Sequence, residues 1–264
     1  MESSGIRSLV CPNCGAPIRH GELECDYCGA AIYAERAAEV TVPAVGEAQK
    51  IIAEMQRRIK SNGYDGDAYY QLGLACFTLK LYDQAENAFE QARRFSPGSA
   101  LVHYFVGLAM LRRAEPEILS IQEFRIIQMR KAFQAALALD ANLSEAEWHH
   151  LLTDGLLARN REDYAGALAP LKSVVQMSPK LGLAWKVLAA CYFQVGDYHN
   201  AIHAGSQAFQ LDKLDGDIAY LIGAAHCYLG ETDDMRVWAK RVAVLRGDPD
   251  AWPSVTREFR GQIE

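Results

Sequence analysis

The sequence predicts an all-α protein of stacked helical hairpins behind a small metal-binding segment. Small residues recur with a period of 34 residues: Gly107 follows Gly73 at this interval, and Gly155, Ala189 and Gly223 repeat it. A fixed period of this length is typical of helical hairpins that bury their apolar faces only by stacking on neighbours. Two Cys-x-x-Cys-Gly sequences near the N-terminus provide the second signal.

The residues around each small position indicate two helices per unit. The first unit places an aromatic residue and a Leu-Gly pair on one helix, then small and aromatic residues on a second helix before a proline: Tyr69, Leu72, Gly73, Ala85, Phe89, Ala92 and Pro97. This row resembles the tetratricopeptide repeat, which implies a solenoid of about five repeats. The expected repeats are 66–99, 100–143, 148–181, 182–215 and 216–249. In the fourth, Gly196-Asp197-Tyr198 predicts a tight turn between the helices.

The second unit carries an insertion. Gly107 and Phe133 are 26 residues apart, where the equivalent positions of the first unit are 16 apart. Residues 114–117, with a proline in the first turn, are typical of a helix start. Because no helix breaker follows before Leu139, we expect a long second helix that projects beyond its neighbours. Two interpretations of the insertion remain open. It is either an insertion that a loop tolerates, or a contact with a partner through residues 114–122.

The N-terminal segment, residues 1–32, resembles a small zinc ribbon. Cys11 and Cys14 form one Cys-x-x-Cys-Gly knuckle, and Cys25 and Cys28 form the other. Four thiolates on two knuckles suit a closed tetrahedral Zn²⁺ site, in which the metal is structural. A rubredoxin-like iron site, a redox Cys-x-x-Cys pair and two disulfides are less favoured, because the spacing and the context fit them poorly. We therefore expect one zinc ion per chain.

The segments around the repeats are predicted as a linker and two caps. Residues 33–46 are rich in Ala, Glu and Val and are expected to be a linker before a solenoid domain over 47–264. Residues 47–61 place isoleucines and a methionine on one helical face, which predicts a leading helix against the first repeat. Residues 250–264 are expected to form a charged capping tail.

Composition and charge limit the function classes. Half of the chain is apolar, enough for a continuous solenoid core, and the formal net charge is −6. Residues 1–32 contain two basic and four acidic side chains, whereas nucleic-acid binding needs clustered Lys and Arg. Neither a signal peptide nor a run of apolar residues long enough to span a membrane is evident. Three further cysteines, Cys76, Cys191 and Cys227, are expected as buried free thiols in a reducing, cytoplasmic environment.

Catalytic motifs are missing from the sequence. It contains no Gly-rich phosphate loop, no Gly-x-Ser-x-Gly and no His-Glu-x-x-His. His199 and His203 are four residues apart, but no third ligand stands at a recognisable spacing. We therefore expect no enzyme activity and no small-molecule substrate.

The resemblance to tetratricopeptide repeats implies a concave groove lined by the first helix of each repeat. The positions that face ligands in that family are mostly apolar or aromatic here. They predict these partner-binding residues: Tyr70, Leu74, Phe77, Tyr104, Leu108, Leu152, Leu156, Lys186, Phe193, Tyr220 and Tyr228. An amphipathic helix suits such a groove, supplied by a partner or by the chain's own tail, and we favour the partner.

The sequence thus predicts a non-enzymatic adaptor or scaffold that binds a protein or peptide partner, with the zinc ribbon as a second interaction module. One alternative is a regulatory nucleic-acid-binding protein that uses the ribbon. Another is the recognition subunit of a larger enzyme complex. Salt-dependent binding to nucleic acid separates the first alternative from the adaptor.

Overall fold

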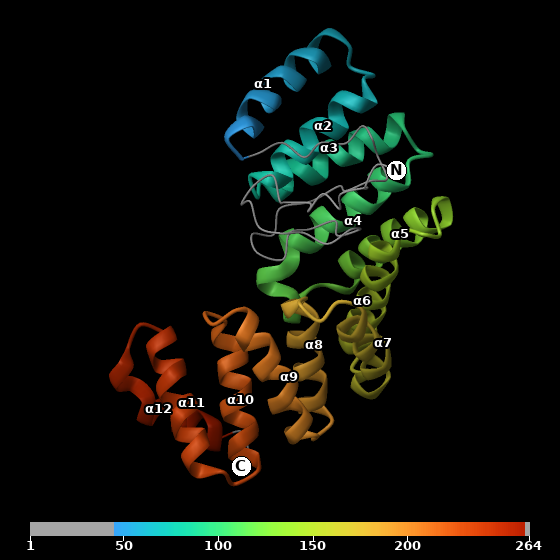
Figure 1. Cartoon of the computed structure of the whole chain (residues 1–264). Helices are drawn as coiled ribbons and strands as arrows, with labels where there is room; N and C mark the ends of the chain where they lie inside the picture. The colour runs from blue at the N-terminus through green and yellow to red at the C-terminus, as the bar shows by residue number, and fades with distance from the viewer. Residues whose placement is uncertain (1–44, 262–264) are drawn as a thin grey trace, which may run out of the picture. The chain divides into compact units, whose positions relative to one another are not determined.

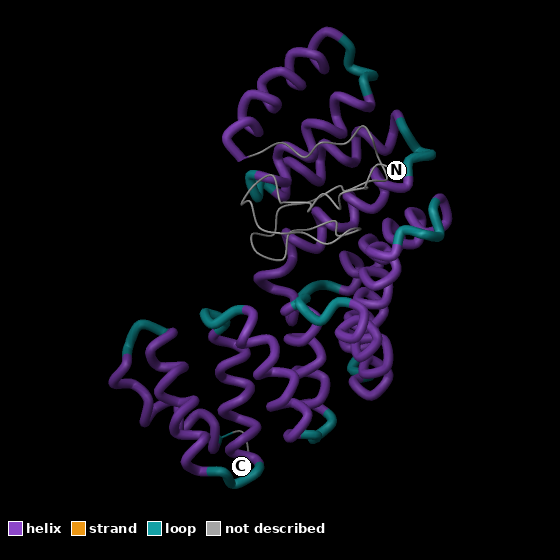
Figure 2. The backbone as a smooth tube through the Cα atoms, in the orientation of Figure 1, coloured by secondary structure: helices purple, strands orange, loops and turns teal. Residues whose placement is uncertain are grey.

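The computed structural model describes residues 45–261, and these residues form twelve α-helices, two short 3-10 segments and no strand (Figures 1 and 2). The expected zinc ribbon over 1–32 and nearly all of the linker lie outside the described residues. The described helices divide into two compact units. One holds the described residues up to Pro116 together with Lys131–Glu147, and the other holds Glu117–Arg130 and the described residues from Trp148 onward.

The first unit begins with helix α1, Val45–Ser61, which packs on helix α2, Gly66–Thr78. Ala48 and Met55 of α1 are buried, which confirms the predicted leading helix. Helix α2 pairs with α3, Tyr82–Phe95, and α3 packs on α4, Ala100–Ala114. Figure 1 shows these helices following one another as antiparallel hairpins.

The recurrent glycines let the paired helices approach closely. A Cβ built on Gly73 would lie 2.5 Å from the ring of Phe89 on α3. A Cβ on Gly107 would lie 2.7 Å from the ring of Phe133. Both rings are fully buried, so each glycine forms the floor of an aromatic pocket. The close approach that the 34-residue period predicts is therefore present.

The structure of the inserted segment in the second repeat differs from the prediction. Residues Glu115–Ser120 form the 3-10 segment η1, and α5 begins only at Glu123 and ends at Leu139. The prediction of a single long, projecting helix is therefore wrong. Ile118 and Ile121 are buried, and the Asn160 side chain donates a hydrogen bond to the Ile121 carbonyl oxygen at 2.9 Å. Ile118 and Ile121 thus pack inside the protein, because burial removes their apolar surface from water.

The second unit contains three further hairpins and a terminal helix. Its helices are α6 (Ser144–Asn160, which begins in the first unit), α7 (Tyr164–Met177), α8 (Gly182–Gln194), α9 (Tyr198–Leu211), α10 (Gly216–Tyr228), α11 (Thr232–Leu245), η2 (Pro249–Ala251) and α12 (Trp252–Arg260). From α7 to α12, each α-helix packs on the next. Val255 and Phe259 of α12 are buried, so the expected capping tail contains a helix with a docked apolar face.

The turns inside the hairpins share one backbone conformation. Four residues at equivalent positions have positive φ: Lys80 (59°), Glu162 (62°), Gly196 (80°) and Gly230 (74°). The predicted Gly196-Asp197-Tyr198 turn is confirmed, because α8 ends at Gln194 and α9 begins at Tyr198. Lys80 and Glu162 adopt the left-handed conformation that glycine accepts without strain.

Candidate partner-binding surface

Most of the predicted groove residues lie in the core. Seven of them are buried: Tyr70, Leu74, Phe77, Tyr104, Leu108, Leu152 and Leu156. Tyr104 and Leu108 are each 1% exposed, so the expectation that this pair faces outward is wrong. The ring centroid of Tyr104 lies 5.3 Å from that of Phe105 and 5.9 Å from that of Phe133.

Lys186 is also held inside the protein. Its ammonium lies 2.8 Å from a carboxylate oxygen of Asp215 and 3.2 Å from one of Asp217, and its side chain is 12% exposed. Burial acts to lower the pKa of Lys186, but the two carboxylates outweigh it and raise the pKa above its ordinary value. Asp215 also caps α10, where its other oxygen accepts backbone N–H groups. Lys186 therefore links neighbouring repeats.

Tyr220 is covered by the chain's own C-terminal helix. Its ring lies 4.9 Å from the ring of Phe259 on α12, and the Arg246 guanidinium stacks over it at 5.6 Å. Burial, followed by the nearby Glu258 carboxylate, raises the pKa of Tyr220. At this position the tail fills the surface that we had assigned to a partner.

Phe193 and Tyr228 remain partly exposed and form a surface cluster with Tyr198, which the sequence predicted as a turn residue and not as a binding residue. We call these three residues the aromatic trio. The rings of Tyr198 and Tyr228 stack at 4.6 Å with an interplanar angle of 11°, and Phe193 meets both edge-on at 5.5 and 5.6 Å. The period could have identified Tyr198, because Tyr164 precedes it by 34 residues.

Arg159 lies at the position of Phe193 in the preceding repeat, 34 residues earlier. Its Nε is buried and has no hydrogen-bond partner among residues 45–261. Burial raises the pKa of the Cys191 thiol to about 11, and the nearby Arg159 charge acts in the opposite direction. An arginine whose Nε finds no acceptor within the described range therefore lies near Cys191 of α8, the helix that also carries Phe193.

The remaining predicted features have mixed outcomes. The proposed zinc ligands Cys11, Cys14, Cys25 and Cys28 lie outside the described residues. Cys76 and Cys191 are buried free thiols as expected, whereas Cys227 is only partly buried. His199 and His203 are both exposed on α9. Within the described range, none of the helices combines the length and the apolar character needed to cross a bilayer.

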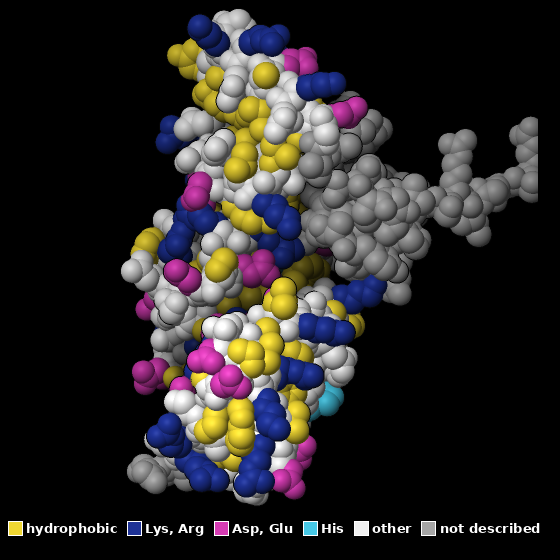
Figure 3. All heavy atoms as spheres, turned by 90° about the vertical axis from the view of Figure 1, so that its left-hand side faces the viewer, with side chains coloured by type: hydrophobic (Ala, Val, Ile, Leu, Met, Phe, Trp, Pro, Cys, Tyr) yellow, Lys and Arg dark blue, Asp and Glu magenta, His cyan; other side chains and the backbone are white. Residues whose placement is uncertain are grey.

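Figure 3 shows one face of the molecule, on which apolar side chains alternate with Lys and Arg over the C-terminal helices. Val237 and Val244 of α11 are 57% and 58% exposed. The Arg241 guanidinium, between them along the helix, stacks on the rings of Phe209 and Trp238. Isolated apolar residues of this kind are common on protein surfaces and indicate no site alone.

Comparison with known proteins gives the fold a family context. Residues 66–97 match the tetratricopeptide repeat. Superkiller protein 3 of Schizosaccharomyces pombe is 32% identical over 206 residues, an alignment that covers 62% of this chain and 14% of that protein. This chain therefore corresponds to only a small part of that relative.

Two solved structures show the same fold at low sequence identity. The Cut9–Hcn1 hetero-tetramer of the APC/C aligns with 81% of this chain and 40% of its own, at 16% identity and a TM-score of 0.59. PilW, a type IV pilus biogenesis factor, aligns with 80% of this chain and 91% of its own, at 19% identity and a TM-score of 0.57. The described part of the chain is thus an all-helical array of the tetratricopeptide type.

Proposed function

We propose that the protein is a non-enzymatic adaptor that binds a protein partner at the aromatic trio and Arg159. The observation that carries the proposal is the half-exposed trio, which stands out because most other predicted groove residues are buried. Tyrosine and arginine are enriched among the residues that dominate binding energy in protein interfaces.

The geometry of the trio favours binding at a low entropic cost. Tyr198 and Tyr228 hold each other in a stacked pair, and Phe193 packs against both edges. Rings that are already fixed lose little conformational freedom when a partner covers them. An aliphatic or aromatic side chain from the partner suits this surface.

Arg159 adds a preference for negative charge. A buried guanidinium nitrogen without an acceptor costs free energy, because it has lost water without gaining a hydrogen bond. A carboxylate supplied by the partner would satisfy the guanidinium through a charge-assisted hydrogen bond. The proposed partner segment therefore combines an apolar anchor with an acidic residue.

The proposal includes the N-terminal ribbon and the compartment. Cys11, Cys14, Cys25 and Cys28 would hold one structural zinc ion in a second interaction module, and the protein would act in the cytoplasm. The free thiols of Cys76 and Cys191 support a reducing environment, because proteins of oxidising compartments usually pair their cysteines in disulfides.

Affinity purification of the full-length chain from its native source, followed by mass spectrometry, tests the function. We expect a stoichiometric protein partner that the Phe193→Ala, Tyr228→Ala double variant loses. Removing central aromatic anchors typically weakens binding by about 2 kcal/mol or more. The matched control is Val237→Ala, Val244→Ala, which truncates exposed apolar side chains on α11 and should retain the partner.

Two results would reject the proposal. Equal retention of the partner by both double variants would exclude the trio as the binding surface. Loss of the partner after nuclease treatment would show that nucleic acid bridges the two proteins. Circular dichroism of each variant checks that the helical fold is intact.

A further inference from the structure

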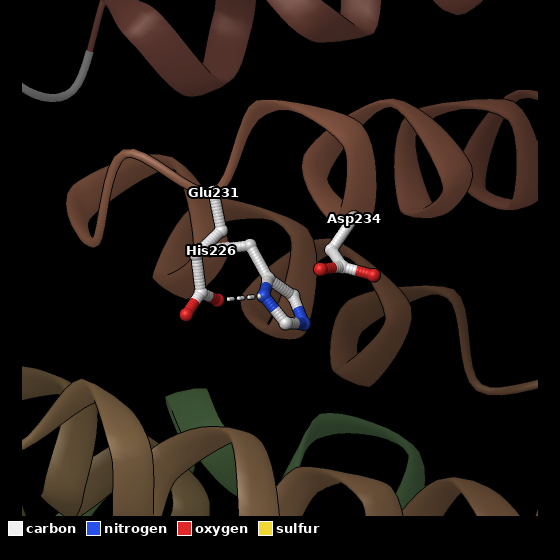
Figure 4. Close-up of side chains that lie close together, drawn as sticks. All are labelled: His226, Glu231 and Asp234. Carbon is white, nitrogen blue, oxygen red and sulfur yellow. Dashed lines mark hydrogen bonds and ion pairs between the residues drawn. The ribbon is translucent and has the colours of Figure 1, made fainter.

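Three potential metal ligands converge where α10 turns into α11. His226 lies near the end of α10, Glu231 lies just before α11, and Asp234 lies in the first turn of α11 (Figure 4). One ligand atom from each residue lies within 4.8 Å of the others. Among residues 45–261, this is the one group of three His, Cys, Asp or Glu side chains with that spacing.

The orientation of Glu231 differs from that of its counterparts in the preceding repeats. Asp163 and Asp197 stand 68 and 34 residues earlier and cap α7 and α9, because their carboxylates accept backbone N–H groups. Glu231 makes no such capping bond to α11. Its Oε2 instead lies 2.6 Å from Nδ1 of His226, as the dashed line in Figure 4 shows.

Asp234 brings a second negative charge to the same place. Its carboxylate lies beside the imidazole ring in Figure 4. The nearest arginine along the helix, Arg236, bonds to Asp233 instead. Two carboxylates held this close repel each other, and one imidazole compensates for them only when it is protonated. A bound cation would relieve this repulsion.

The repeat pattern does not dictate this set of ligands. The equivalent positions of the first hairpin hold Cys76, Leu81 and Gln84, and those of the fourth hairpin hold Tyr192, Asp197 and Asn200. These three positions lie at the same turn in the other two hairpins, but the residues there are not His, Glu and Asp. The chemistry of the site comes from the residues of the last repeat.

We infer that His226, Glu231 and Asp234 bind a divalent transition-metal ion of the zinc type. One imidazole nitrogen and two carboxylate oxygens are typical zinc donors, with metal–ligand distances of about 2.0–2.2 Å. On binding, the metal takes the place of the hydrogen bond between Nδ1 and Oε2, and any proton of that bond passes to solvent. The two exposed carboxylates close the remaining distance by side-chain rotation. Three protein donors leave a coordination position open to water or to a donor from another molecule.

Zinc titration of the full-length chain tests this site. Elemental analysis first counts the zinc that the purified chain already holds, so that the N-terminal cysteines are accounted for separately. Calorimetry then measures the additional zinc, and ¹⁵N NMR follows the imidazole nitrogens of His226. We expect a further equivalent to bind, and the His226 nitrogen signals to shift as it does.

Substitutions at the proposed ligands test whether the additional zinc binds to His226 and Asp234. His226→Gln and Asp234→Asn should each weaken binding of this equivalent by about tenfold or more, because even the loss of a residue that only orients a metal ligand typically costs about 10- to 100-fold in affinity. Asp233→Asn and His203→Gln are matched controls that alter an exposed carboxylate and an exposed histidine outside the site, and they should bind as the unmodified chain does. The proposal is overturned if no additional zinc binds, or if His226→Gln binds it as tightly as the controls.

Discussion

The first and the last hairpins use the same glycine pocket but fill it from different sources. In the first hairpin, Phe89 of α3 occupies the pocket of Gly73, 16 residues earlier in the chain. In the last hairpin, the residue 16 positions after Gly223 is Ala239, and the pocket is filled by Phe259 of α12. A Cβ on Gly223 would lie 2.4 Å from that ring.

This difference shows that the first hairpin completes its own core, whereas the last depends on a segment outside the repeat. The fourth repeat gives a third arrangement, in which Ala189 replaces the first-helix glycine and Gly205 replaces the large residue opposite. A Cβ on Gly205 would lie 2.8 Å from Ile222 on α10. Both members of the pair are therefore small in this repeat, and Ile222 of the following repeat supplies the large side chain.

The strongest test of this comparison is Phe259→Ala. Because Phe259 is fully buried, its loss should lower the free energy of unfolding of the second unit by about 3–5 kcal/mol. Hydrogen exchange should show lost protection in α10, α11 and α12, and unchanged protection in α2 and α3. Phe89→Ala should give the reverse pattern, and identical patterns for the two variants would refute the comparison.

Gly73→Ala probes the pocket of the first hairpin from the other side. The new methyl group would overlap the buried Phe89 ring, so we expect a loss of about 1–3 kcal/mol in unfolding free energy. Gly98→Ala is the matched control, because a Cβ there meets no atom within 4 Å. Urea denaturation measures both. Equal stability of the two variants would mean that the pocket relaxes freely.

A smaller effect is expected at the turns. Lys80 adopts a φ of 59°, where the last hairpin has Gly230 at 74°. Lys80→Gly should therefore stabilise the protein by up to about 1 kcal/mol, since relief of the strain exceeds the added entropy of the unfolded chain. Gly230→Ala should destabilise it. Thermal unfolding of the two variants gives the signs, and a loss of stability in Lys80→Gly would contradict this account.

The smallest effect concerns the Asp-Gly-Asp sequences that begin α2 and α10. Asp65 accepts the backbone N–H of Ala68 and hydrogen bonds from Arg58, and these interactions lower the pKa of Asp65. A lowered folded-state pKa stabilises the fold above the ordinary value of 3.8, and this stabilisation is lost as the pH falls through the lowered value. Asp65→Asn should remove that acid dependence, as unfolding between pH 5 and 2 would show. A variant as acid-sensitive as the unmodified chain would exclude Asp65 as its source.

The period identified the helical pairs because it follows from stacking. Glycines at 34-residue intervals mark close helix contacts, so the hairpins, the leading helix α1 and the Gly196 turn could be predicted. The spacing also revealed the insertion, but not its conformation, since no helix-breaking residue marks the end of η1. Burial of Ile118 and Ile121 there depends on tertiary contacts that propensity does not encode.

The candidate site was predicted only in part. Family positions identified Phe193 and Tyr228, but they also assigned Tyr104 and Leu108, which are buried, to the surface. Tyr198 was predicted only as a turn residue, although it stands in register with the repeats. Exposure depends on which neighbouring side chains are large, and a position within a repeat does not specify this.

Helix α12 has one more consequence. A helical array exposes an apolar end at its last repeat, and a second copy of the chain could stack there head to tail, forming an open filament. Phe259 closes that end within the same molecule. The nine-residue helix α12 therefore covers the apolar end on which such head-to-tail stacking would depend.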